Sequence, residues 1–288
     1  MNKNFEKKDK IFFFNKGYIV KNSFISDYWI KKLNASINKL IKKSCLLKKS
    51  NKFFDLENNH TSKNPRLRRI SYLDDLDPIF WKFCKNSKLP DIATSIFGPN
   101  IRFRECMINI KWSDGGSEVK WHQDIPFYPM TNSSVAQHLV LLKDVDIKQG
   151  PLKVLPGSHK KKLYDHYDKK DNWLGYIPEK QLKNLNLNKS VSLTGNAGTV
   201  TVHHCRTLHA SQQNLSKQGR PVLIVSYASC DNFPYTPAAY VSSHYGEVVR
   251  GEEAKFARHE PGVLRLPPDW SDGYTSIFDY QSKKNIKP

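Results

Sequence analysis

Two residues of the sequence, His122 and Asp124, have the types and the spacing needed to bind a metal ion. They lie in the segment EVKWHQDIPFYP, between apolar and aromatic residues. On a β-strand, residues i and i+2 point to the same face, so one imidazole and one carboxylate would be directed at one point. The pair alone is a weak signal, because His-x-Asp triplets also occur by chance on ordinary strands.

A third candidate ligand, His209, follows the β-rich stretch GTVTVHHC at 198–205. Two histidines and one carboxylate form a facial triad, which leaves positions open on the metal and suits Fe(II) sites that activate O2. A bidentate 2-oxo acid would take two of these positions, and O2 would take the third. The distal carboxylate of such a co-substrate needs a permanently charged fork, which an arginine supplies. Arg220 follows His209 across a turn-rich segment, and Ser211 shares a face with His209 if that segment is extended.

The elements that must position these residues begin with helices. Apolar residues recur at three- and four-residue steps over residues 26–43, which predicts an amphipathic helix with Ser26 as its N-cap. A second helix is predicted over residues 78–97. Residues 50–76 are polar and aperiodic, and we interpret them as a long loop of the kind that often covers a site.

After Gly98 the sequence changes to short β-rich runs separated by turn residues. Strands of this length and spacing, without helices between them, predict a β-sandwich or barrel. The runs are residues 101–112, 135–145, 152–156, 190–194, 198–205 and 220–229. The chain has 288 residues with no internal repeat and no low-complexity linker, so one domain is the simpler interpretation.

In the order of its candidate ligands along the chain, the sequence resembles the phytanoyl-CoA dioxygenase family of Fe(II)/2-oxoglutarate oxygenases. The resemblance is carried by WHQD at 121–124, by GPLKVLPGSHK at 150–160, and by LHASQQN from Leu208 followed by Arg220. It covers roughly residues 15–230. It implies a mainly β fold, a double-stranded β-helix (jelly roll, cupin-like) core with flanking N-terminal α-helices.

The resemblance also implies roles for individual residues. It makes His122, Asp124 and His209 the catalytic iron ligands, and it makes Arg220 and Ser211 the partners of the 2-oxoglutarate carboxylate. Asn109 matches a position that donates to the same co-substrate in some members. The family also includes halogenases in which a small residue replaces the acidic ligand, so Asp124 favours hydroxylation here.

On this reading residues 1–288 form one oxygenase domain. Residues 15–98 would make a helical N-terminal layer and lid, residues 99–230 the jelly-roll core, and residues 231–288 a C-terminal closure. The expected cofactors are Fe(II), 2-oxoglutarate as co-substrate, and O2. The expected reaction hydroxylates, or otherwise oxidises, a C–H bond of a small anionic or zwitterionic metabolite and releases succinate and CO2. The alternatives are a desaturating or ring-forming oxygenase of natural-product biosynthesis, and a non-catalytic jelly-roll binding module.

The formal net charge of +19 requires an interpretation. Residues 1–88 hold 21 Lys and Arg against 8 Asp and Glu, mostly as lysine interleaved with asparagine. We interpret the excess as a solvated basic face, with attraction of an anionic substrate as the alternative, and expect no nucleic-acid partner. Within it, Arg66, Arg68 and Arg69 either lie on a solvated loop or supply one cation that binds a carboxylate or phosphate of the substrate or of 2-oxoglutarate.

The expected compartment is the cytoplasm. The five cysteines are scattered and none has C-x-x-C spacing, which fits a reducing environment. The apolar run at 11–14 is too short for a signal peptide, and no stretch is long enough to span a membrane, so no membrane partner is expected. The expected partner is a small-molecule substrate, and the sequence carries no signal for its identity or for an oligomeric state.

Overall fold

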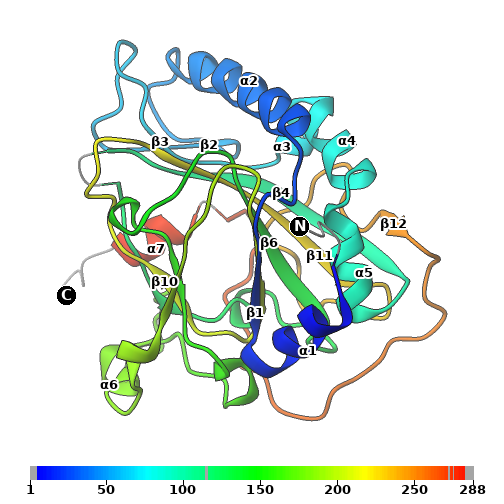
Figure 1. Ribbon diagram of the computed structural model, residues 1–288. Coiled ribbons are helices and arrows are strands. Elements are labelled where there is room, and N and C mark those ends of the chain that lie inside the picture. Colours follow the sequence, from blue (N-terminus) through cyan, green and yellow to red (C-terminus); the bar gives the residue numbers. More distant parts are fainter. Residues whose placement is uncertain (1–4, 114–115, 272, 275, 283–288) are drawn as a thin grey trace.

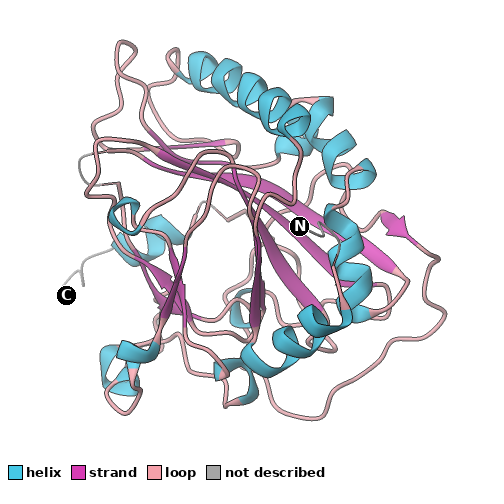
Figure 2. Ribbon diagram, in the orientation of Figure 1, coloured by secondary structure: helices cyan, strands magenta, loops and turns pink. Residues whose placement is uncertain are grey.

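The strands of the computed structural model form two antiparallel sheets (Figures 1 and 2). A cavity lined by residues of both sheets lies between them. The structure describes residues 5–113, 116–271, 273–274 and 276–282. The large sheet has the strand order β1-β9-β6-β11-β4-β3-β2, with β12 also paired to β4, and the small sheet has the order β5-β10-β7-β8. This is the predicted double-stranded β-helix.

The strand bounds show which predicted runs pair. The strands are β1 (Tyr18–Lys21), β2 (Phe54–Leu56), β3 (Leu67–Ile70), β4 (Ile101–Lys111), β5 (Val119–His122), β6 (Val135–Leu141), β7 (Leu152–Val154), β8 (Val191–Leu193), β9 (Val200–His204), β10 (His209–Ser211), β11 (Arg220–Ser229) and β12 (Val248–Arg250). All six predicted runs contain a strand. The additional ones, such as β5 and β10, are mostly three or four residues long, too short to show a periodicity.

The N-terminal helices cover the outer face of the large sheet. The α-helices are α1 (Lys7–Lys16), α2 (Asp27–Ser44), α3 (Leu73–Leu76), α4 (Pro78–Asn86), α5 (Leu89–Phe97), α6 (Glu179–Leu182) and α7 (Ile277–Ser282). Leu33 of α2, Phe80 of α4 and Ile92 of α5 are fully buried in the same apolar cluster as Phe103 of β4 and Leu223 of β11. Among the described residues, no helix is long and apolar enough to cross a membrane.

The predicted helix over 26–43 is confirmed as α2, with Ser26 at the N-cap position, although its side chain makes no capping hydrogen bond. The single helix predicted over 78–97 is wrong, because the chain forms α4 and α5 with a break at Ser87. Ser87 has an extended backbone, and its hydroxyl accepts a hydrogen bond from the Leu89 amide at 3.1 Å. Pro90 then falls in the first turn of α5, where its missing N–H costs nothing.

The long loop predicted over 50–76 is also wrong in part. Two short strands, β2 and β3, pair with each other, and β3 adds to the large sheet beside β4. Phe54, Leu67 and Ile70 are buried in the helix-side core, and this burial outweighs the polar composition around them. The consequence for the cavity is that Arg69, on β3, is held by the sheet.

Side-chain alternation on the central strands separates the two faces of the large sheet. On β11, Val222 and Ile224 line the cavity, whereas Leu223 and Val225 belong to the helix-side core. Because alternate residues point to opposite faces, the helices seal one face and leave the other for the cavity. Arg220, at the start of the same strand, follows this alternation and lines the cavity.

The segment after β11 closes part of the cavity wall. Tyr240, Tyr274 and Ile277 line the cavity, and Trp270 is buried against the first two. The predicted irregular closure therefore includes one helix, α7, and the residues 272, 275 and 283–288 of that segment lie outside the described residues. The division of the chain into layer, core and closure stays a prediction.

The helix-side core yields a stability prediction. Replacing the fully buried Leu33 by alanine should lower the free energy of unfolding by about 2–5 kcal/mol, because it leaves a cavity between α2 and the sheet. Leu46, which is 86% exposed, is the matched control, and its replacement by alanine should cost less than about 0.5 kcal/mol. Denaturant unfolding measures both. Equal losses in the two variants would contradict the assignment of the core.

Candidate metal centre

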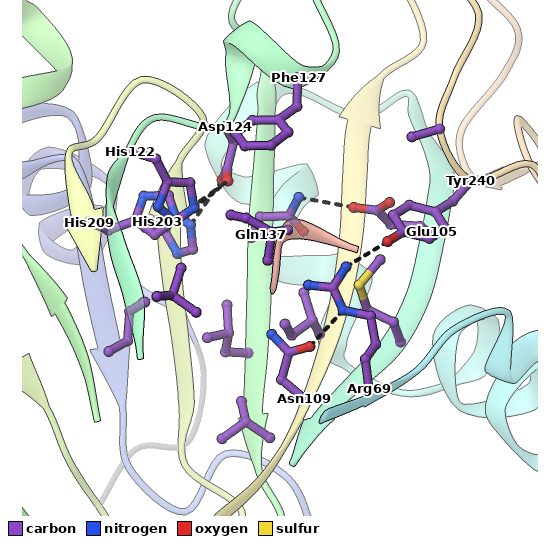
Figure 3. Close-up of a pocket in the computed structure, with 18 of the residues that line it drawn as sticks. Arg69, Glu105, Asn109, His122, Asp124, Phe127, Gln137, His203, His209 and Tyr240 are labelled. Atoms are coloured by element: carbon purple, nitrogen blue, oxygen red, sulfur yellow. Dashed lines mark hydrogen bonds and ion pairs between the residues drawn. The ribbon is translucent and has the colours of Figure 1, made fainter. Parts of the chain in front are cut away.

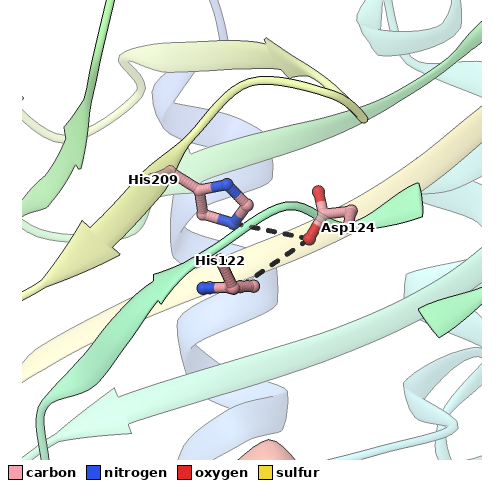
Figure 4. A group of neighbouring side chains, drawn as sticks. All are labelled: His122, Asp124 and His209. Carbon is pink, nitrogen blue, oxygen red and sulfur yellow. Dashed lines mark ion pairs between the residues drawn. The ribbon is translucent and has the colours of Figure 1, made fainter. Parts of the chain in front are cut away.

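Three side chains converge where β5 and β10 of the small sheet meet the cavity (Figure 4). The antiparallel register sets His122 opposite His209, and Asp124 follows β5 by two residues. Asp124 Oδ1 lies 3.8 Å from His122 Nε2 and 3.4 Å from His209 Nε2. The candidate ligand atoms all lie within 4.8 Å of one another, so one metal ion between them could bind all three residues.

Strand alternation does not direct Asp124 to this point, contrary to the sequence prediction. β5 ends at His122, and Asp124 has helical backbone angles and leads into a short 3-10 helix, Ile125–Phe127. The amides of Asp124 and Ile125 both donate to the Cys205 carbonyl, at 2.9 and 3.1 Å. This turn brings the carboxylate back toward the two imidazoles.

The two histidines are oriented with Nε2 toward the carboxylate. His122 Nδ1 lies 2.8 Å from the Lys120 carbonyl oxygen, and His209 Nδ1 lies 2.8 Å from the Thr207 carbonyl oxygen. A carbonyl oxygen only accepts hydrogen bonds, so each Nδ1 carries the proton and donates. The lone pair of each Nε2 is thereby left for a metal ion.

A further histidine, His203 on β9, contacts the same carboxylate. Its Nε2 lies 3.0 Å from Asp124 Oδ2, and its side chain is buried. The sequence motifs did not single out His203 as a site residue. The signal that could have identified His203 is the strand alternation of 198–205, which sets His203 and His204 on opposite faces.

Burial and mutual contact set the protonation of the group. Burial raises the pKa of Asp124, but His209 and His203 outweigh it and hold that pKa well below its usual range. Burial, together with His209, holds the pKa of His122 well below its usual range. Burial lowers the pKa of His209, but Asp124 and the Thr207 carbonyl outweigh it and the net pKa is raised. A metal ion would therefore compete with a proton mainly at His209.

The cavity beside this group has a volume of about 150 Å³ and is lined from both sheets. Figure 3 shows the histidines and Asp124 on one side, and Arg69, Glu105 and Asn109 on the other. Its walls between these groups are apolar, with Leu139, Leu152, Val222 and Ile224 among the lining residues. The site is thus a largely apolar pocket with polar groups at two places, as ligand sites commonly are.

The residues predicted to bind the co-substrate, Arg220, Ser211 and Asn109, line this same cavity. The segment of Ser211 is extended, as β10, and Ser211 is buried beside His209. Asn109 Oδ1 accepts a hydrogen bond from Arg69 Nε at 2.8 Å, so only its amide nitrogen is left to donate to a ligand.

Arg220 is a buried cation that forms no ion pair with any described residue. It is 5% exposed, and its Nε forms no hydrogen bond with any described residue. Burial lowers its pKa to about 10, which still leaves the guanidinium charged at neutral pH. An unpaired buried cation is costly, so a carboxylate at this place would be strongly favoured. The donor set of the triad and this unpaired arginine fit an iron ion and a 2-oxo dicarboxylate.

Beside Arg220 lies a buried lysine that sequence reasoning did not identify. Lys111 is the register partner of Arg220, and its Nζ donates to the Ser211 carbonyl at 3.0 Å and to the Gln212 carbonyl. Burial, followed by the neighbouring Arg220, lowers the pKa of Lys111 from 10.5 to about 6. Lys111 ties the end of β10 to β4.

The three arginines at 66–69 have separate partners. Arg66 donates to the Ser113 carbonyl, and Arg68 forms ion pairs with Asp55 and Asp279. Arg69 lines the cavity, donates to the Tyr240 hydroxyl at 2.6 Å, and is 6% exposed. Of the two alternatives left open for this cluster, a solvated loop is therefore excluded for Arg69.

Comparison with known proteins identifies the family. Residues 13–222 match the family described as Phytanoyl-CoA dioxygenase (PhyH). This chain belongs to the phytanoyl-CoA dioxygenase family. The predicted resemblance is confirmed. The matched residues include the three iron-ligand candidates, the segment LPGSH and Arg220.

Similar proteins are dioxygenases, among them one named as dependent on alpha-ketoglutarate (2-oxoglutarate). A probable alpha-ketoglutarate-dependent hypophosphite dioxygenase of Stutzerimonas stutzeri is 30% identical, over 93% of this chain and 94% of that protein. An ectoine dioxygenase of Bordetella parapertussis is 24% identical, over 75% of this chain and 73% of that protein. The crystal structure of EctD from S. alaskensis with bound Fe covers 87% of this chain and 88% of that one at 22% identity, with a TM-score of 0.70, a likeness of fold.

The chain is therefore an Fe- and 2-oxoglutarate-dependent dioxygenase with the jelly-roll fold of its family. The predicted enzyme class and the predicted cofactors are confirmed. The role of each site residue stays a prediction.

The contact between His203 and Asp124 leads to a test. His203→Leu should weaken Fe(II) binding by about 10–100-fold, because the carboxylate loses the partner that orients it. His203→Gln retains a side-chain N–H donor and should lose less. Anaerobic titration with Fe(II) measures both affinities. Wild-type affinity in His203→Leu would contradict an orienting role.

Lys111 leads to a pH prediction. Because its pKa falls from 10.5 to about 6 on folding, the unfolded chain binds more protons between these values, and stability rises with pH across that window. Lys111→Met should remove up to about 1.4 kcal/mol per pH unit from that rise. Denaturant unfolding at several pH values within the window measures the slope, with the exposed Lys39→Met as control. An unchanged slope in Lys111→Met would show that Lys111 does not titrate in the folded protein as described.

Proposed function

We propose that this enzyme hydroxylates a C–H bond of a small anionic or zwitterionic metabolite, with conversion of 2-oxoglutarate and O2 to succinate and CO2. The observation that carries the proposal is the distribution of charge in the cavity. The metal-ligand candidates lie on one side, Arg220 lies near the start of β11, and two more buried arginines, Arg69 and Arg104, line the wall.

In this proposal His122, Asp124 and His209 hold Fe(II), which when bound supplies the activation of O2. Arg220 and Ser211 bind the distal carboxylate of 2-oxoglutarate, and the Asn109 amide donates to the same co-substrate. Arg220 is suited to this role because its guanidinium is buried, charged and without a partner at Nε.

The remaining residues orient groups and exclude water. His203 holds Asp124 through Oδ2, and the Lys120 and Thr207 carbonyls hold the imidazole rings. The apolar side chains of Leu139, Leu152 and Val222 separate the charged groups from one another and limit water in the cavity. The cavity of about 150 Å³ favours a compact substrate.

A second candidate reaction is oxidation of a phosphorus oxyanion. It is favoured by the 30% identity to a probable hypophosphite dioxygenase, over 94% of that protein. Hypophosphite is a small anion and suits the positive charge of the cavity. A panel containing hypophosphite, ectoine, L-proline and simple phosphonates, assayed by substrate-dependent succinate release, would separate the two candidates.

The proposed iron site predicts the effect of one substitution. His209→Ala should lower Fe(II)-dependent release of succinate from 2-oxoglutarate by more than about 100-fold, because the site loses one of three ligands. His259→Ala, at an exposed histidine, is the matched control and should behave as wild type. Removal of metal by a chelator should abolish wild-type activity, and added Fe(II) should restore it.

Full activity in His209→Ala would contradict the iron assignment. Succinate release in wild type, even without a primary substrate, would exclude the alternative of a non-catalytic binding module. Analysis of the oxidised product by mass would separate hydroxylation, which adds one oxygen, from desaturation or ring formation, each of which removes two hydrogens.

A further inference from the structure

An irregularity of β4 directs two neighbouring side chains into the cavity. In the pairing of β4 with β11, Glu105 is opposite Ser226, but the next partner, Tyr227, is opposite Phe103. Arg104 has no partner of its own, so it is the extra residue of a β-bulge. Bulges re-aim side chains and are frequent next to active sites.

The bulge changes which face each residue takes. Phe103 and Cys106, on either side of it, belong to the helix-side core, whereas Arg104 and Glu105 both line the cavity. In a regular strand, alternation would turn one of these two residues toward the helices. The sequence FREC thus places a cation and a carboxylate side by side in the cavity wall.

Arg104 has unused hydrogen-bonding capacity. It is 4% exposed, and neither its Nε nor its Nη1 forms a hydrogen bond with a described residue. Its guanidinium carbon lies 4.2 Å from the centroid of the Tyr128 ring. Burial lowers the pKa of Arg104, but Tyr245, Tyr128 and Glu105 outweigh it, and the net pKa is raised. The side chain is a buried, charged group that is hydrogen-bonded to Tyr245 but has no acceptor at Nε or Nη1.

Two arginines and two acidic residues surround the bulge. Arg69, Arg104 and Glu105 line the cavity, whereas the buried Asp74 lies in a smaller pocket behind it with Arg104 and Glu105. Glu105 Oε1 accepts a hydrogen bond from Gln137 Nε2 at 3.1 Å. Arg69 donates hydrogen bonds from Nε to Asn109 and from Nη1 to Tyr240, whereas the same two nitrogens of Arg104 have no acceptor. A ligand that supplies negative charge would offset the cost of the unpaired cation.

The place of Arg104 along the sheet separates it from the proposed 2-oxoglutarate site. Arg104 precedes Lys111, the register partner of Arg220, by seven positions, which corresponds to about 20 Å along a strand. The two arginines therefore start from different levels along the cavity, which fits two separate ligands.

Arg104 lies instead at the level of the metal-ligand candidates. The strand registers align Glu105 with Ser226, Ser226 with Gln137, and Gln137 with His203, in one row across the large sheet. His203 contacts Asp124. A group held by Arg104, next to the end of this row, would lie across the cavity from the iron, where a primary substrate must be.

We infer that the bulged Arg104 forms an oxyanion subsite that binds the acidic group of the primary substrate, with Glu105 beside it to accept a hydrogen bond from a donor on that substrate. The inference rests on the proposed function and names the recognition element of its substrate. The class of ligand is a compact molecule with a phosphinate, phosphonate or carboxylate group.

The test is a binding measurement and does not depend on turnover. Protein with Fe(II) and 2-oxoglutarate, kept free of O2, is titrated calorimetrically with hypophosphite, methylphosphonate and acetate, and the titrations are repeated without metal. Arg104→Gln should bind the best of these probes at least about tenfold more weakly, because a charge-assisted hydrogen bond is lost. Glu105→Gln should bind it more tightly, because a repelling charge is removed.

Arg102→Gln is the matched control on the same strand. Its guanidinium donates to the Cys230 carbonyl and to Glu253, away from the cavity, so probe affinity should be unchanged. Arg220→Gln should lose affinity for 2-oxoglutarate and retain affinity for the probes. Thermal unfolding of each variant shows that it is folded before its affinity is compared with that of the wild type.

Preference for hypophosphite or methylphosphonate over acetate would assign a phosphorus oxyanion, and the reverse a carboxylate; both support the subsite. Wild-type probe affinity in Arg104→Gln, loss of probe binding in Arg220→Gln alone, or binding of no probe to wild type would overturn it. Full activity of His209→Ala would overturn the iron assignment but would leave the result of the metal-free titration unaffected. Failure of the proposed function can therefore be distinguished from failure of the Arg104 subsite.

Discussion

The register between β5 and β10 is the constraint on which the rest of the site depends. It sets His122 directly opposite His209, and a slip by one residue would turn His209 to the other face of the small sheet. The same strand β10 is held on its second edge by β7, where His209 faces the fully buried Val154. Two histidines 87 positions apart in the sequence are thereby brought together by backbone hydrogen bonds before any metal is considered.

The large sheet supports this arrangement from across the cavity. Its central strands bury one set of side chains under the helices and present the other set to the cavity, so packing and chemistry use alternate residues of the same strands. Ionisable groups such as Arg220 and Lys111 are held in that interior by β4 and β11, the longest paired strands. The stability lost by burying these groups is offset by the apolar core on the opposite face.

Much of the fold and the site could be predicted from residue patterns. The helix periodicity of α2 and the apolar run of β11 are long enough to be read directly, and the WHQD and LPGSH segments indicated the family. The short strands β2 and β3 could not be predicted, because three or four residues show no periodicity and their existence depends on distant partners. For the same reason the segments of β5 and β10 could be considered as strands only because they carry candidate ligands. The break between α4 and α5 was missed although Pro90 marks it.

Residues that act through tertiary contacts could not be identified from the sequence for a related reason. Strand alternation places His203 and His204 on opposite faces but does not show which of them faces the cavity, and nothing local distinguishes Lys111 from the many other lysines. The roles of His203 and Lys111 arise from Asp124 and from the Ser211 carbonyl across the sheets. The bulge at Arg104 was likewise invisible, since an unpaired residue is defined only by the partner strand. Arg69 was named among three candidates, and only the pairing of β3 with β4 singles it out.

The contact of His203 with Asp124 has a consequence for coordination number. Because Oδ2 accepts a hydrogen bond from His203, Oδ1 is the oxygen that faces both imidazoles. The carboxylate is thus set up to be a monodentate ligand. In an octahedral arrangement, three single-atom protein ligands leave three places, whereas a chelating carboxylate would leave two. One histidine outside the ligand set would in this way preserve the vacancy that a second small molecule needs once a chelating co-substrate is in place.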